Sequence, residues 1–79
     1  MKITITKSDI RKGVKCNFRF CPVAKALRRI TKRRDVWVDL RGAKIKNWYY
    51  DLPEVARCFI SDFDLGHPVQ PFSFDLPVL

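Results

Sequence analysis

Residues 36–50, with the sequence VWVDLRGAKIKNWYY, decide the fold. The first five residues alternate, with both valines and the leucine on one face, which is typical of a strand packed on a core. Arg41-Gly42 supplies a turn, and residues 43–50 return as a second strand. The stretch therefore predicts a β-hairpin, and the segments on either side determine how this hairpin is covered.

A helix is predicted on each side of the hairpin. Pro22 suits the first position of the upstream helix, because its missing N–H costs nothing there, and this helix should end near Arg33 or Arg34. Downstream, Asp51-Leu52-Pro53 begins a second helix in the same way, and Gly66 ends it. Apolar residues at helical spacing give each helix a buried stripe, namely Val23, Ala26, Leu27 and Ile30 in the first and Val55, Phe59, Ile60 and Phe63 in the second.

Strands are predicted at both ends of the chain. Residues 2–7 alternate, and Ser8 then caps a single helical turn that Gly13 ends in a left-handed conformation. Residues 69–78 also alternate, but Pro71 and Pro77 cannot donate to a ladder, which places this strand at a sheet edge. The last strand is therefore expected to run as far as Val78.

The predicted order is β-α-β-β-α-β within one α+β domain that spans residues 1–79. A chain this short buries one modest core. The order suits a ferredoxin-like split βαβ sandwich, in which two helices cover one face of a four-stranded antiparallel sheet. Other pairings of the same elements stay open.

The charge is divided unevenly along the chain. The net charge is +8, yet residues 1–46 contain fifteen basic and three acidic residues, whereas residues 47–79 contain one basic and five acidic residues. Such a field attracts polyanions or acidic protein surfaces. The basic half of the chain is therefore where a partner is expected to bind.

The first helix carries most of this positive charge. No Asp or Glu lies between residues 10 and 34, so the usual compensation by i,i+4 pairs is absent. The alternative is a solvated helix face built from ordinary helix formers. Because the basic positions lie off the apolar stripe, reversing Arg28, Arg29 and Lys32 should leave the fold intact. The predicted partner-binding residues are Lys25, Arg28, Arg29, Lys32, Arg33, Arg34, Trp37, Lys44 and Lys46.

The element order is also that of an RNA recognition motif, which stacks bases on aromatic residues of its two central strands. The first strand here, Ile3-Thr4-Ile5-Thr6, has no aromatic residue, and Arg41-Gly42 is not followed by the required aromatic pattern. That motif is absent. The aromatic residues left to stack on bases beside Lys44 and Lys46, or else to pack in the core and the hairpin, are Trp37, Trp48, Tyr49 and Tyr50.

Metal, membrane and catalytic functions find little support in the sequence. Cys16, Cys21, Cys58 and His67 lack the two close ligand pairs of structural zinc sites, so no metal or cofactor is expected. An odd number of cysteines favours reduced thiols and a cytoplasmic location. No apolar run approaches the roughly 20 residues of a membrane span. With one histidine and no phosphate-binding loop, the chain is not expected to be an enzyme.

Two motifs carry a resemblance to known proteins. One is the helix start Cys21-Pro22-Val23-Ala24, and the other is the ending Phe63-Asp64-x-Gly66 followed by Pro71-Phe72-x-Phe74. With these motifs the chain resembles a family of small proteins encoded by tailed bacteriophages and prophages.

That resemblance implies a phage origin, and phage proteins without enzyme motifs often block a host complex, as anti-CRISPR proteins do. We therefore expect an inhibitor that acts in the host cytoplasm on a protein or ribonucleoprotein assembly such as a CRISPR-Cas effector complex. The alternative is a regulatory protein that binds nucleic acid directly through the basic helix and the hairpin.

Overall fold

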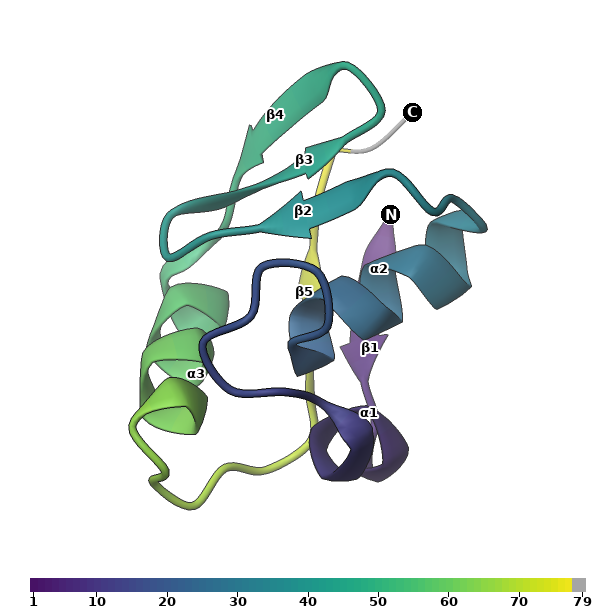
Figure 1. The fold of residues 1–79 in the computed structure, drawn as a ribbon. Helices are drawn as coiled ribbons and strands as arrows, with labels where there is room; N and C mark the ends of the chain where they lie inside the picture. Colours follow the sequence, from purple (N-terminus) through teal and green to yellow (C-terminus); the bar gives the residue numbers. More distant parts are fainter. Residues whose placement is uncertain (78–79) are drawn as a thin grey trace.

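The computed structural model describes residues 1–77, so the predicted end of the last strand at Val78 lies outside the described residues. Within them the chain forms three helices and five strands (Figure 1). In chain order the elements are β1 (Lys2–Ile5), α1 (Lys7–Lys12), α2 (Pro22–Thr31), β2 (Val36–Val38), β3 (Gly42–Ile45), β4 (Trp48–Asp51), α3 (Glu54–Asp64) and β5 (Phe72–Asp75).

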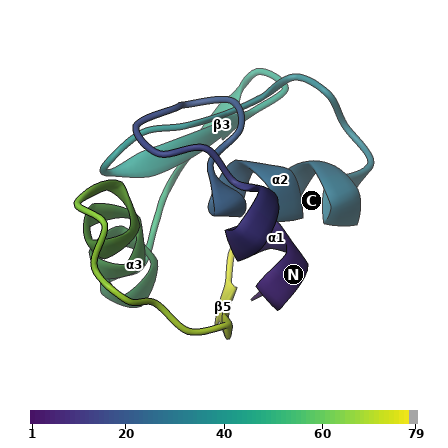
Figure 2. The same ribbon diagram turned by 60° about the horizontal axis from the view of Figure 1, so that its bottom comes forward.

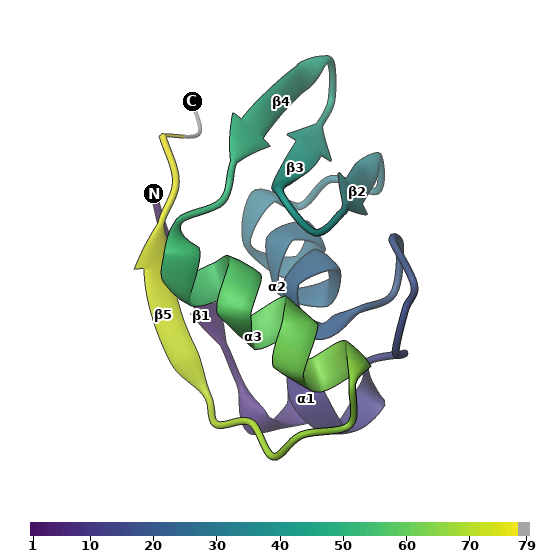
Figure 3. The same cartoon turned by 90° about the vertical axis from the view of Figure 1, so that its left-hand side faces the viewer.

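The strands form two separate antiparallel sheets. One sheet pairs β1 with β5, with Ile3 opposite Phe74, and the other has the order β2-β3-β4. The α+β class is confirmed, but the single four-stranded sheet of the ferredoxin-like prediction is wrong. Within the described residues, β1 and β5 pair with each other and with no other strand, and Figure 3 shows β5 beside α3, apart from the three-stranded sheet.

The predicted strand at residues 43–50 is in fact two strands. Lys46 adopts a left-handed conformation with φ 58°, and together with Asn47 it forms a turn that brings Trp48 opposite Ile45. The earlier strand also ends sooner than predicted, at Val38, and β3 already begins at Gly42. The hairpin is therefore a three-stranded meander, and the second turn decides which side chains share a face.

The core lies around α2, which packs against β1, β2 and α1 (Figures 1 and 2). Pro22 occupies the first turn of α2, as predicted, and the Cys21 thiol caps the helix by accepting from the Ala24 N–H at 3.4 Å. The helix ends at Thr31 rather than near residue 33, because Lys32 turns left-handed. On the opposite side of the core, α3 packs on β5, with the Phe59 and Phe72 ring centroids 4.7 Å apart.

The caps of α1 and α3 differ from their predictions. Thr6, not Ser8, caps α1, because its hydroxyl accepts from the Asp9 N–H while the Asp9 carboxylate accepts from the Thr6 N–H. Gly13 is extended rather than left-handed, and a Cβ there would lie 2.6 Å from Pro22, so close approach requires the glycine. Pro53 is the N-cap of α3 and not, as predicted, its first residue, but Gly66 does end the helix region, with φ 81°.

A candidate binding surface on the β2–β3–β4 sheet

Strand alternation divides the side chains of the three-stranded sheet between two faces. Trp37 pairs with Lys44 and Lys44 pairs with Tyr49, so these three side chains form a row across the outer face. Trp37 is 47% exposed and Tyr49 is 53% exposed. Figures 1 and 3 show the helices gathered on the other side of this sheet. The core side of the sheet is formed by Val36, Val38, Ala43 and Ile45, all of which are buried.

The loop between α1 and α2 extends the outer face beyond β2. The Val38 N–H donates to the Phe18 carbonyl at 2.8 Å, which ties the loop to the edge of the sheet. Within the loop, the Asn17 side chain accepts from the backbone N–H of Arg19 at 3.0 Å. In this conformation Phe18 is exposed, and the Arg19 guanidinium lies over the Trp37 ring, 5.1 Å from its centroid.

A second aromatic group continues the same surface toward α2. The exposed Phe20 ring has the Arg28 guanidinium 5.0 Å from its centroid and the Lys25 ammonium 5.8 Å away. Burial, and then repulsion from the nearby Arg19, lower the pKa of Arg28. We name this surface the aromatic–basic track, and it consists of Tyr49, Lys44, Trp37, Phe18, Arg19, Phe20, Arg28 and Lys25.

A shallow hollow lies at each end of the track. The hollow on the sheet has a volume of about 460 Å³ and is bordered by Phe18, Trp37 and Tyr49, among others. The hollow beside Phe20 has a volume of about 370 Å³ and is bordered by Lys25 and three further basic residues of α1 and α2. Aromatic rings therefore form much of the wall at one end, and cations dominate the other.

The Asp39 carboxylate borders the sheet end of the track. It accepts from the backbone N–H groups of Arg41 and Gly42 and from the Tyr49 hydroxyl, the last at 3.0 Å. Partial burial alone would raise the pKa of Asp39, but these hydrogen bonds hold it below its ordinary value. The carboxylate thus holds the β2–β3 turn and fixes the orientation of the Tyr49 ring.

The structure uses several of the predicted binding residues within the fold. Arg29 donates to the buried Asp9 carboxylate and to the Thr4 carbonyl, both at 2.9 Å, and these contacts argue against the expectation that Arg29 can be reversed without affecting the fold. Arg28 donates to the Val36 carbonyl at 3.2 Å. Ion pairing therefore removes part of the positive charge that the sequence assigned to a partner.

The remaining predicted residues are divided among different surfaces. Arg33 forms an ion pair with Asp35 through two contacts of 2.9 Å. Lys32 and Arg34 are exposed in the connection between α2 and β2. Four of the predicted residues belong to the track, namely Lys25, Arg28, Trp37 and Lys44. The sequence prediction missed Phe18, Arg19 and Phe20, although their alternation of aromatic and basic residues was a usable signal.

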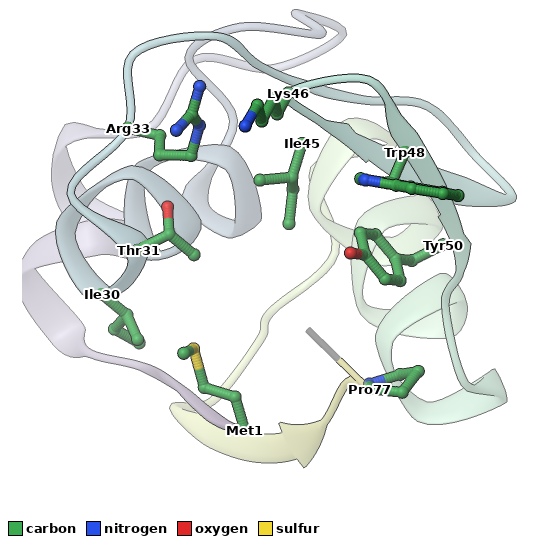
Figure 4. A pocket seen from close by; sticks show the side chains of 9 residues that line it. All are labelled: Met1, Ile30, Thr31, Arg33, Ile45, Lys46, Trp48, Tyr50 and Pro77. Atoms are coloured by element: carbon green, nitrogen blue, oxygen red, sulfur yellow. The ribbon is translucent and has the colours of Figure 1, made fainter. Parts of the chain in front are cut away.

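Lys46 and Arg33 lie at a different cavity, together with Trp48 and Tyr50 (Figure 4). This cavity has a volume of about 550 Å³ and lies between the core side of the hairpin, the end of α2 and the N-terminal Met1. Trp48 lies opposite Ile45 in the ladder, which places it on the face away from the track. The four aromatic residues that the sequence grouped for stacking are therefore divided between two faces.

The three cysteines differ in their exposure. Burial raises the pKa of the Cys21 thiol, whereas Cys16 and Cys58 are exposed. Among residues 1–77, no three His, Cys, Asp or Glu side chains are close enough together to hold one metal ion. In the same part of the chain, no helix has both the length and the apolar character needed to cross a bilayer.

No protein-family model, curated protein or solved structure matches this chain. Aromatic faces stack on planar groups, and lysine and arginine side chains pair with anions. The arrangement is suited to binding a partner that offers both.

Proposed function

We propose that this chain is a non-catalytic binding protein of bacteriophage type that blocks a host assembly by occlusion. A CRISPR-Cas effector complex in the host cytoplasm is the first target to test. The observation that supports this proposal most is the exposed row of Trp37, Lys44 and Tyr49 on a sheet face with no helix over it.

The composition of the track favours an interface over a solvated surface. Tryptophan, tyrosine and arginine are the residues that most often dominate the binding energy of interfaces. A cluster of exposed aromatic side chains on a small domain is also more than the scattered apolar exposure of ordinary surfaces. The surrounding positive charge would speed encounter with an acidic partner or a ribonucleoprotein.

Hydrogen bonds hold the sheet end of the track in place before any partner arrives. The Phe18 carbonyl is bonded to β2, the Tyr49 hydroxyl is bonded to Asp39, and the row itself lies on paired strands. Such preorganisation limits the conformational entropy lost on binding. A standard interface covers about 800 Å² per partner, which is about 15% of the 5281 Å² surface of this domain. The track and its immediate neighbours can supply that area.

The test is a pull-down with the tagged chain from host lysate at physiological salt, combined with a plaque assay on hosts with and without an active CRISPR system. We expect the wild-type chain to recover a host complex and to raise plaque formation only on the CRISPR-active host. The double variant Trp37→Ala/Lys44→Glu should lose both effects.

The double variant Trp48→Ala/Lys46→Glu is the matched control, because it makes the same changes on the same meander outside the track. It should behave as wild type. Recovery of no host complex, or equal loss in both double variants, would refute the proposal.

A further inference from the structure

We infer that the track binds single-stranded nucleic acid, with unpaired bases on its aromatic rings and phosphates on its cations. This inference rests on the proposed function, because it assigns a partner class to the same surface. The observation behind it is the alternation of the two side-chain types, since cations separate the aromatic rings along the track.

The sheet end of the track has the spacing of two stacking positions with a charge between them. Trp37 lies on β2 and Tyr49 lies on β4, and Lys44 of β3 separates them in the same row. Neighbouring strands are about 5 Å apart, so the backbone positions that carry the two rings are roughly 10 Å apart. Two unpaired bases can stack on these rings while the phosphate between them pairs with Lys44.

The other end of the track offers a second set of the same contacts. Phe20 presents an exposed ring, and Lys25 and Arg28 lie beside it. Arg19 joins the two ends, because its guanidinium lies over Trp37 while its charge acts on Arg28. A strand of several nucleotides can therefore follow the track from Tyr49 to Lys25.

A single strand fits these observations better than a duplex does. Paired bases present no free faces to exposed rings, so a duplex would leave the aromatic half of the track without a role. A duplex would depend on phosphate contacts along α2, where Arg29 is bonded to Asp9 and Arg33 lies against Asp35 just beyond the helix.

The track also predicts tolerance of base sequence. Stacking uses the face that every base has, and sequence-specific readout needs polar groups aimed at base edges. At the sheet hollow, the Tyr49 hydroxyl already donates to the Asp39 carboxylate, so these two groups are not free to read a base edge. Oligothymidine and oligouridine are therefore suitable probes.

The experiment measures fluorescence anisotropy of labelled dT12, U12 and a 12-base-pair DNA duplex at 50 and 200 mM salt. We expect both single strands to bind at least about tenfold more tightly than the duplex at equal salt. If four cations of the track contact phosphates, single-strand affinity should fall about 50-fold between the two salt concentrations, from a slope of about −0.7 per phosphate. Equal affinity for the single strands and the duplex would overturn the inference.

Variants separate stacking from charge. Trp37→Ala should weaken dT12 binding about 5- to 150-fold, the range expected for loss of one stacked base, whereas Trp48→Ala on the other face should change it less than twofold. Tyr49→Phe keeps the ring but loses the bond to Asp39, so it should lose less affinity than Tyr49→Ala. Thermal melts establish that each variant is folded. A folded Trp37→Ala protein that binds dT12 like wild type would overturn the inference.

The two proposals fail in different ways. If the chain recovers a host complex that survives nuclease treatment, yet binds neither dT12 nor U12, the nucleic-acid inference fails and the occlusion proposal stands. If the chain binds the oligonucleotides through Trp37 but recovers no host complex, the occlusion proposal fails and the inference stands.

Discussion

Reversing the charge of Arg29 should destabilise the fold, even though this residue is half exposed. Its guanidinium lies 2.9 Å from the carboxylate of Asp9, which is only 7% exposed and also accepts from the Thr6 N–H in the capping box of α1. The same guanidinium donates to the Thr4 carbonyl. Arg29 therefore connects α2 to both β1 and α1.

The magnitude follows from the contacts that Arg29→Glu removes and creates. A hydrogen bond to a charged group contributes about 1.5–3 kcal/mol. Two like charges 4 Å apart repel by about 1 kcal/mol in water and about 4 kcal/mol at an effective dielectric constant of 20. Because the Arg29 side chain is 49% exposed, the lower half of both ranges applies, and the sum is about 3 kcal/mol.

The assay is thermal and urea unfolding followed by circular dichroism. For a domain of this size, about 3 kcal/mol corresponds to a fall in Tm of at least about 12 °C. Arg34→Glu is the control, since the change in charge is the same and Arg34 is exposed; it should change stability by less than about 0.5 kcal/mol. Equal melting of the two variants would refute the structural role of Arg29.

Three further predictions test the fold and the turn beside the track. Iodoacetamide at pH 8 should modify Cys16 and Cys58 quickly but Cys21 only in denaturant, as measured by mass spectrometry of the intact protein. Rapid modification of all three cysteines would contradict the burial of Cys21. Gly42→Ala should lower the free energy of unfolding in urea by about 1–3 kcal/mol, because the added Cβ would lie 2.5 Å from a backbone oxygen of β4. An unchanged urea midpoint would contradict this close packing. The pKa of Asp39 is lower in the folded protein than in the unfolded chain, where it is near 4. The stability that this difference contributes is present above the unfolded pKa and is lost as the pH falls through the lower folded pKa. Asp39→Asn should therefore flatten the dependence of Tm on pH between about 5 and 3, and an equally steep curve would contradict this role of Asp39.

Local signals predicted the helices and the hairpin because those elements depend on neighbouring residues. Pro22 and the apolar stripe that follows it are sufficient to begin and orient α2. The second turn of the meander has a weaker signal, since Asn47 is a common turn residue but a lysine with positive φ, as at Lys46, is uncommon. The pairing of β1 with β5 joins opposite ends of the chain, and alternation alone does not identify a strand's partner.

The candidate site was predictable only in part, because some of its contacts join residues that are far apart in the sequence. Trp37 and Lys44 belong to a short alternating strand pattern, which placed them on an exposed face. The interval without acidic residues ran from residue 10 to residue 34, yet Asp9 and Asp35 lie just outside it and pair with arginines inside it. Sequence spacing alone therefore overstated the free charge of α2. It also gave no role to Phe18, Arg19 and Phe20, because the bond that ties their loop to β2 is a tertiary contact.

The central claim is that the partner meets the outer face of the β2–β3–β4 sheet and not its other face. The two tryptophans report on these faces separately, since Trp37 lies on the track and Trp48 lies at the opposite cavity. Fluorescence titration with dT12 of two single-tryptophan proteins, Trp48→Phe and Trp37→Phe, tests the claim most directly. We predict that stacking quenches Trp37 in the first protein and leaves Trp48 unchanged in the second. Quenching of Trp48, with Trp37 unaffected, would contradict the account.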